Sequence, residues 1–379
     1  MKIKTITLVG LIGSSLLLSG CGGGGGGTAP IMPDTPYVFS DGTAITNTGT
    51  GVNDSKLGAT YISDAVTIVQ DSINIAIDNA ADTTADATAI KNLLNDETAY
   101  LNLLGTANLT TEERNDLLVL GRLYRNIKTT SDTYSHLNVT GVQQAHADGW
   151  TGKGVTIGVY DAEFDNLSGH GFNVSLLVAS VAPAATINSY TDYNVTAEIL
   201  NNDVITTSID GATTSRATAV EGSNALATVA AQHTNGAGEG KANMTSCDVN
   251  NRTVANCNTW AAAGLNGSNV IYVGEVDGSN NIPAWSNKAG DTHKNQFLVT
   301  SSNALYNPAG DTNGNSFAAP RVAGAGALVR HKFPNLSGSQ AATVILHTAD
   351  DLGATGVDAV YGYGKLNVGK ALAPVGSLH

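Results

Sequence analysis

Short apolar runs are spaced along residues 152–379 in a pattern that the rest of the chain lacks. Helical or glycine-rich stretches separate these runs, which cover residues 155–160, 184–189, 204–207, 270–276 and 296–300. Strands that alternate with helices indicate an α/β fold with a parallel sheet. In such sheets, residues that bind ligands or react lie at the carboxyl ends of the strands.

Residues 58–135 are almost free of Gly and Pro and show helical spacing instead. One predicted helix face carries Ile90, Leu93, Leu94, Leu101 and Leu104. Thr110 and Glu113 form a capping-box pattern ahead of the next apolar stretch. We therefore predict a small, mainly helical region over 58–135. A pro-segment, a spacer and a docking module all fit this pattern, which contains no chemical motif.

The first residues have the layout of an export signal. Lys2 and Lys4 precede an apolar core over residues 6–18, which is too short to cross a bilayer. The segment ends in Leu-Ser-Gly-Cys at 18–21, which resembles a bacterial lipobox, and this resemblance implies lipidation of Cys21. A plain secretory signal over residues 1–20 is the alternative. Gly22 follows the cysteine, and the resemblance to Gram-negative lipoproteins then favours the outer membrane, on its periplasmic or cell-surface face.

Residues 21–57 are rich in Gly and Pro and begin with an unbroken run of glycines at 22–27. We interpret this segment as a flexible tether. The remaining residues, 136–379, contain the apolar runs described above. They form the predicted main domain.

Composition narrows the possible partners. The chain has 19 Lys and Arg against 32 Asp and Glu, a net charge of −13, which argues against a nucleic-acid partner. Besides Cys21 it contains Cys247 and Cys257, too few cysteines for a disulfide-rich scaffold. Outside the cytoplasm these two would close a short loop, although two free thiols remain the alternative.

Three motifs contain the candidate chemistry. Residues 154–161 read GVTIGVYD, so that an apolar strand ends in Asp161. Residues 169–174 read GHGFNV, in which glycines leave the imidazole of His170 accessible at a helix start. Residues 314–320 read GNSFAAP and place Ser316 at the start of a helix rich in small residues, where unpaired backbone N–H groups can stabilise an oxyanion. A helix-capping serine is the simpler interpretation of Ser316.

In the order Asp, His, Ser, these motifs resemble those of the subtilisin-like serine proteases, the subtilases. The closing stretch over 348–367 is similar to that of subtilase passengers in autotransporters. The resemblance covers roughly residues 136–379 and implies a three-layer fold with a mainly parallel central sheet flanked by helices. It also implies a secreted, lipid-anchored serine endopeptidase that uses Asp161, His170 and Ser316 and contacts both a polypeptide substrate and, through Cys21, a lipid bilayer.

The resemblance suggests further site residues. Thr206, Thr207 and Ser208 match the strand that lines the substrate cleft. The family uses an Asn side chain as an oxyanion donor, for which Asn235 is the candidate and His233 the competitor. Subtilases often bind structural calcium, but the sequence indicates no calcium site, metal-ligand set or cofactor motif.

Two features depart from the family pattern. Asp161 and His170 lie nine residues apart, closer than usual, and residues 208–229 look too short for the helix and strand expected there. Two alternatives therefore stay open. One is a catalytically impaired, peptide-binding lipoprotein, and the other is a remnant of an autotransporter protease without its barrel.

Overall fold

The computed structural model describes residues 39, 44, 45, 49, 139–164, 170–191, 197–209, 212–232, 258–302 and 314–375. The strands in these ranges are β1 (Thr156–Tyr160), β2 (Thr186–Tyr190), β3 (Val204–Thr207), β4 (Leu226–Ala230), β5 (Val270–Val276) and β6 (Phe297–Ser301). They form one sheet in the order β2-β1-β3-β4-β5-β6, and each neighbouring pair is parallel.

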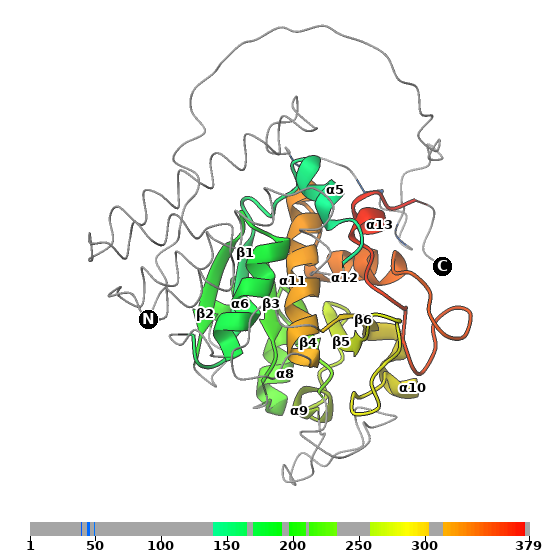
Figure 1. Cartoon of the computed structure of the whole chain (residues 1–379). Helices are drawn as coiled ribbons and strands as arrows, with labels where there is room; N and C mark the ends of the chain where they lie inside the picture. Colours follow the sequence, from blue (N-terminus) through cyan, green and yellow to red (C-terminus); the bar gives the residue numbers. More distant parts are fainter. Residues whose placement is uncertain are drawn as a thin grey trace, which may run out of the picture.

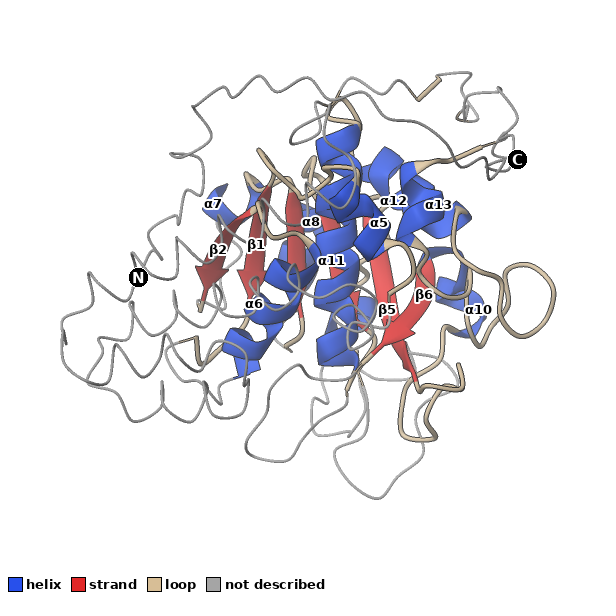
Figure 2. Cartoon of the chain, turned by 45° about the horizontal axis from the view of Figure 1, so that its top comes forward, coloured by secondary structure: helices blue, strands red, loops and turns tan. Residues whose placement is uncertain are grey.

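Helices cover both faces of this sheet (Figure 1). Within the described ranges they are α5 (Val142–Ala147), α6 (His170–Val181), α7 (Ala197–Leu200), α8 (Thr214–Glu221), α9 (Thr259–Ala262), α10 (Gly290–His293), the 3-10 helix η3 (Lys294–Gln296), α11 (Asn315–Lys332), α12 (Gly338–His347) and α13 (Val368–Leu372). Helices α6 and α11 cross the same face of the sheet (Figure 2). This arrangement confirms the predicted three-layer α/β fold with a parallel central sheet.

The core has two parts, one on each face of the sheet. In β5, Ile271 and Val273 belong to the cluster that includes α6 and α11, whereas Val270 and Tyr272 belong to the cluster that includes α8 and α9. The strand is thus buried on both sides. That burial explains why it reads as a continuous apolar run rather than as an alternating one.

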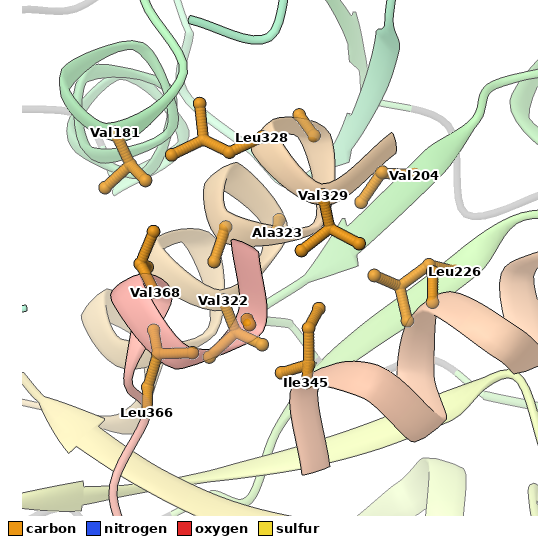
Figure 3. Close-up of a cluster of buried hydrophobic side chains, with 14 of the residues drawn as sticks. Val181, Val204, Leu226, Val322, Ala323, Leu328, Val329, Ile345, Leu366 and Val368 are labelled. Atoms are coloured by element: carbon orange, nitrogen blue, oxygen red, sulfur yellow. The ribbon is translucent and has the colours of Figure 1, made fainter. Parts of the chain in front are cut away.

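Small residues let α11 run through the middle of the domain. A Cβ atom at Gly324 would lie 2.6 Å from the Cβ atom of Val181 in α6, and one at Gly326 would collide with Leu226 of β4. Figure 3 shows Val181 and Leu226 on either side of this helix. Because α11 is buried nearly all round, its sequence shows no apolar stripe.

The predicted strands are found within two residues of their expected bounds, but β4 was not among them. The expectation that residues 208–229 are too short for a helix and a strand is wrong. Helix α8 has eight residues, and the turn Gly222–Ala225 leads directly into β4, so both elements fit. The short, alanine-containing sequence LATVA of β4 provides a weak strand signal.

Part of the segment interpreted as a tether contributes to the folded domain. Phe39 and Ile45 are buried in the cluster around α6 and α11. The amide of Gly49 donates a hydrogen bond of 3.0 Å to the carbonyl of Lys332, the last residue of α11. These positions therefore pack against the domain rather than acting as a loose linker.

The helical region 58–135, the signal segment 1–20 and most of 21–57 lie outside the described residues, so their bounds stay predictions. None of the described helices combines the length and apolar character needed to cross a lipid bilayer.

Candidate active site

Asp161 and His170 meet at the carboxyl end of β1. Asp161 directly follows this strand and is fully buried, and His170 is the first residue of α6. The Nδ1 atom of His170 lies 2.7 Å from Oδ1 of Asp161, so that Nδ1–H donates to the carboxylate. The same oxygen accepts the Ala162 amide at 2.7 Å, which fixes its position. The nine-residue spacing is therefore long enough to bring the two side chains together.

The carboxylate also changes the protonation of the imidazole. Burial favours the neutral ring, but the hydrogen bond to Asp161 and the charges of Asp161 and Glu163 outweigh this effect. The pKa of His170 is therefore raised above its ordinary value. With about a third of its side chain exposed, the ring remains accessible for proton exchange.

Ser316 lies in the first turn of α11, beside the end of β3. Its Oγ donates to the carbonyl of Ser208 at 3.4 Å, and the Ser208 hydroxyl donates to the carbonyl of Ser316 at 3.0 Å. The next residue, Phe317, places its ring centroid 5.6 Å from that of His170. The first turn of α11 thus adjoins the Asp161–His170 pair.

A buried polar framework holds the start of α11 against the residues that follow β4 and against the turn at Ser286. Nδ2 of Asn315 donates to the carbonyl of Gln232 at 2.6 Å, and Oδ1 accepts from the hydroxyl of Ser286 at 3.1 Å. The side-chain amide of Asn287 donates to the carbonyl of Ala231 at 2.9 Å. Gln232 itself adopts a positive φ of 69°, a conformation uncommon for a residue with a side chain.

Sequence reasoning assigned no role to Asn315 or Ser286. Their partners lie far away in the chain, and neither residue has a spacing signal that would reveal them. The position of Asn315 inside the serine motif was the nearest clue. Motif residues beside a nucleophile candidate can thus serve as structural anchors.

Thr206 and Thr207, at the end of β3, and Ser208, which follows it, are buried, and their place in a substrate cleft stays a prediction. Cys21, Asn235 with its competitor His233, Cys247 and Cys257 lie outside the described residues, and their roles stay predictions. Within the described ranges no group of three or more His, Cys, Asp or Glu side chains is arranged to hold a metal ion.

The model of the subtilase family matches residues 154–364, more than half of the chain. The chain belongs to the subtilase family. Both the Asp161–His170 pair and Ser316 fall inside the matched range.

Known relatives of this subtilase match over short stretches. It is 48% identical over 59 residues to the Neisserial autotransporter lipoprotein NalP of Neisseria meningitidis serogroup B, and 41% identical over 63 residues to an extracellular serine protease of Serratia marcescens. These stretches are 16% and 17% of this chain and 6% of each relative. It is also 35% identical over 104 residues to subtilisin DY of Bacillus licheniformis, 26% of this chain and 35% of that protein.

Solved structures resemble this subtilase more distantly. A lanthipeptide protease is 18% identical with a TM-score of 0.47, over 64% of this chain and 95% of that protein. MycP1 from Mycobacterium smegmatis is 19% identical with a TM-score of 0.45, over 63% of this chain and 83% of that protein.

Proposed function

We propose that this subtilase is a serine endopeptidase in which Ser316 attacks a peptide bond, His170 transfers the proton and Asp161 orients His170. The observation that carries the proposal is the 2.7 Å hydrogen bond between His170 and Asp161 beside the first turn of α11. A buried carboxylate on Nδ1–H leaves Nε2 as the proton acceptor and stabilises the imidazolium that forms.

In the proposed reaction, Nε2 of His170 takes the proton from Oγ of Ser316 as Oγ attacks the carbonyl carbon. The imidazolium then gives this proton to the leaving amine, and an acyl-enzyme remains. Water, deprotonated by the same imidazole, attacks the ester and releases the acid. Two proton transfers in each half of the cycle return the site to its starting state.

The oxyanion of the tetrahedral intermediate needs hydrogen-bond donors. The amide of Ser316 belongs to the first turn of α11, and the leading N–H groups of a helix have no carbonyl one turn earlier to bond. Asn235 is the proposed second donor, with His233 as its competitor. Losing such a side-chain donor costs about 3–4 kcal/mol of transition-state stabilisation.

The proposed substrate is an extended polypeptide. The expectation that it pairs with the backbone of Thr206 and Thr207 is wrong, because both residues are already paired with β1 on one side and with β4 on the other. Ser208, which follows these paired positions, remains the proposed contact for the substrate backbone. The proposed location is the outer membrane, with acylated Cys21 as the anchor. The lipobox-like sequence supports this location, as do the relatives named a lipoprotein and an extracellular protease. No cofactor takes part in the proposed reaction.

Fluorophosphonate labelling tests the proposal, because the probe reacts with an activated serine. The assay compares the chain from residue 21 onward with its Ser316→Ala variant, with folding of both verified by circular dichroism. We expect labelling of the natural chain and complete loss in the variant. A folded natural chain that stays unlabelled, also after controlled cleavage within residues 58–135, would reject the protease and favour a peptide-binding protein.

A further inference from the structure

Pro320 removes a hydrogen bond from the helix that presents Ser316. In an α-helix each N–H group donates to the carbonyl four residues earlier, and proline has no N–H group. Pro320 lies inside α11, so the carbonyl of Ser316 lacks the N–H group that an α-helix would place four residues later. Ser316 is partly buried, and a backbone carbonyl that loses its helical donor is stabilised when another group supplies the hydrogen bond.

The hydroxyl of Ser208 supplies it. Oγ of Ser208 donates to the carbonyl of Ser316 at 3.0 Å, and Ser208 is only 5% exposed. In return, the Ser208 carbonyl accepts from Oγ of Ser316 at 3.4 Å. The two serines, 108 residues apart, are therefore joined at both their backbone and their side-chain atoms.

Ser208 lies beside Asp161, the partner of His170, at the end of the neighbouring strand. Strand β3 pairs in parallel with β1, and Thr207 stands opposite Tyr160. The next residues along the two strands are Ser208 and Asp161. A hydrogen bond from Ser208 therefore ties the backbone of Ser316 to the same strand pair that holds the partner of His170. A helical N–H at position 320 would instead tie Ser316 to its own helix.

We propose that Ser208 is a positioning residue for Ser316, with its hydroxyl replacing the N–H group that Pro320 lacks. This inference rests on the proposed function. It assigns Ser208 a side-chain role that is separate from the pairing of its backbone with substrate. The hydroxyl fixes the first turn of α11 relative to Asp161 and His170, and thereby the approach of Oγ to the imidazole.

The matched pair Ser208→Thr and Ser208→Val tests this role, since the two side chains have the same shape and differ in the hydroxyl. The readouts are the maximal rate and the half-saturating concentration of fluorophosphonate labelling, together with thermal unfolding. We expect Ser208→Val to lower the maximal rate roughly tenfold relative to Ser208→Thr, the equivalent of one hydrogen bond. The half-saturating concentration should change little.

The decisive test repeats both Ser208 substitutions in a Pro320→Ala variant, because alanine restores the helical N–H donor to the Ser316 carbonyl. In this background the difference between Ser208→Thr and Ser208→Val should fall below about threefold, since the carbonyl then has a second donor. Ser223→Ala is the control for hydroxyl loss. Its hydroxyl also donates to a backbone carbonyl, that of Val220 at 2.7 Å, but at the amino end of β4. We expect it to leave labelling unchanged.

Equal labelling rates for the Ser208→Thr and Ser208→Val variants would overturn the inference, as would a difference that persists unchanged with Pro320→Ala. A loss of thermal stability with unchanged labelling would reduce Ser208 to a structural residue. Failure of the proposed function is seen separately, as a folded natural chain that the probe does not label. In that case Ser208 positions no nucleophile, and the inference is rejected together with the proposed function.

Discussion

The layer formed by α6 and α11 has two ends that are built differently. At the end where both helices begin, here called the open end, His170 and Ser316 adjoin strand ends. There Asp161 and Ser208 form hydrogen bonds with the first residues of the two helices. At the end where the helices finish, here called the closed end, other parts of the chain pack against them. There Gly49 donates to the last residue of α11, and Trp150 packs edge-on against His331 with ring centroids 5.3 Å apart.

The pKa values of two histidines, one at each end, are shifted in opposite directions. His146 lies at the closed end, buried, with Nε2–H donating to the carbonyl of Val181 at 2.7 Å. Burial lowers its pKa to about 4, although the carbonyl works in the opposite direction. At the open end a carboxylate raises the pKa of His170 instead. One residue type thus becomes a packed neutral group at one end and a candidate base at the other.

Replacing the partner of His170 should have the largest effect. Asp161→Asn keeps the size of the side chain but favours the wrong imidazole tautomer, and we expect labelling to slow by roughly 10⁴-fold. Asp277→Asn is the matched control, because Asp277 also follows a strand, β5, but is exposed. Equal slowing in both variants would mean that the Asp161–His170 pair has no special role.

For the buried residues of the segment that precedes Gly49 we expect a loss of stability without a loss of chemistry. Phe39→Ala removes a ring that is 8% exposed and should lower the free energy of unfolding by about 3 kcal/mol. Ala44→Ser, a small change at an exposed position in the same segment, should have little effect. Denaturant unfolding measures both. Unchanged stability in Phe39→Ala would show that this segment does not belong to the folded domain.

His146 should make the closed end sensitive to acid. Its native pKa lies below that of the unfolded state, so the unfolded state binds more protons as the pH falls from about 6.5 to about 4. At 1.36 kcal/mol for each pKa unit, we expect a loss of about 3 kcal/mol over this range. His146→Gln should flatten that part of the pH–stability curve. A slope identical to that of the natural chain would contradict this assignment.

The smallest effect concerns the charge of Glu163 near the open end. Labelling needs the neutral imidazole, so its rate should rise with pH through the pKa of His170. Glu163→Gln removes one of the charges that raise this pKa, and the midpoint should move to lower pH. Asp291→Asn, an exposed carboxylate paired with Lys294, should leave the midpoint in place. A shift to higher pH would contradict the assigned cause.

Local patterns predicted much of the fold. Apolar runs located the strands β1, β3, β5 and β6, since strands buried on both faces are written as continuous apolar segments. The edge strand β2 was also located, although its residues are only partly buried. Strand β4 escaped prediction because its alanines give little strand signal. The burial of Phe39 was not predicted, because flanking Gly and Pro suggested a linker and no local pattern shows that a distant core includes this ring.

The sequence by itself determined the family, the parallel α/β architecture and the identity of Asp161, His170 and Ser316 as candidates, because each depends on short motifs or on local periodicity. Only the tertiary structure decided which group donates to the Ser316 carbonyl, which histidine acquires a raised pKa and what caps the end of α11. These outcomes depend on burial and on partners far away in the chain. Hydrogen bonds and charges act through space, and only the fold sets those distances.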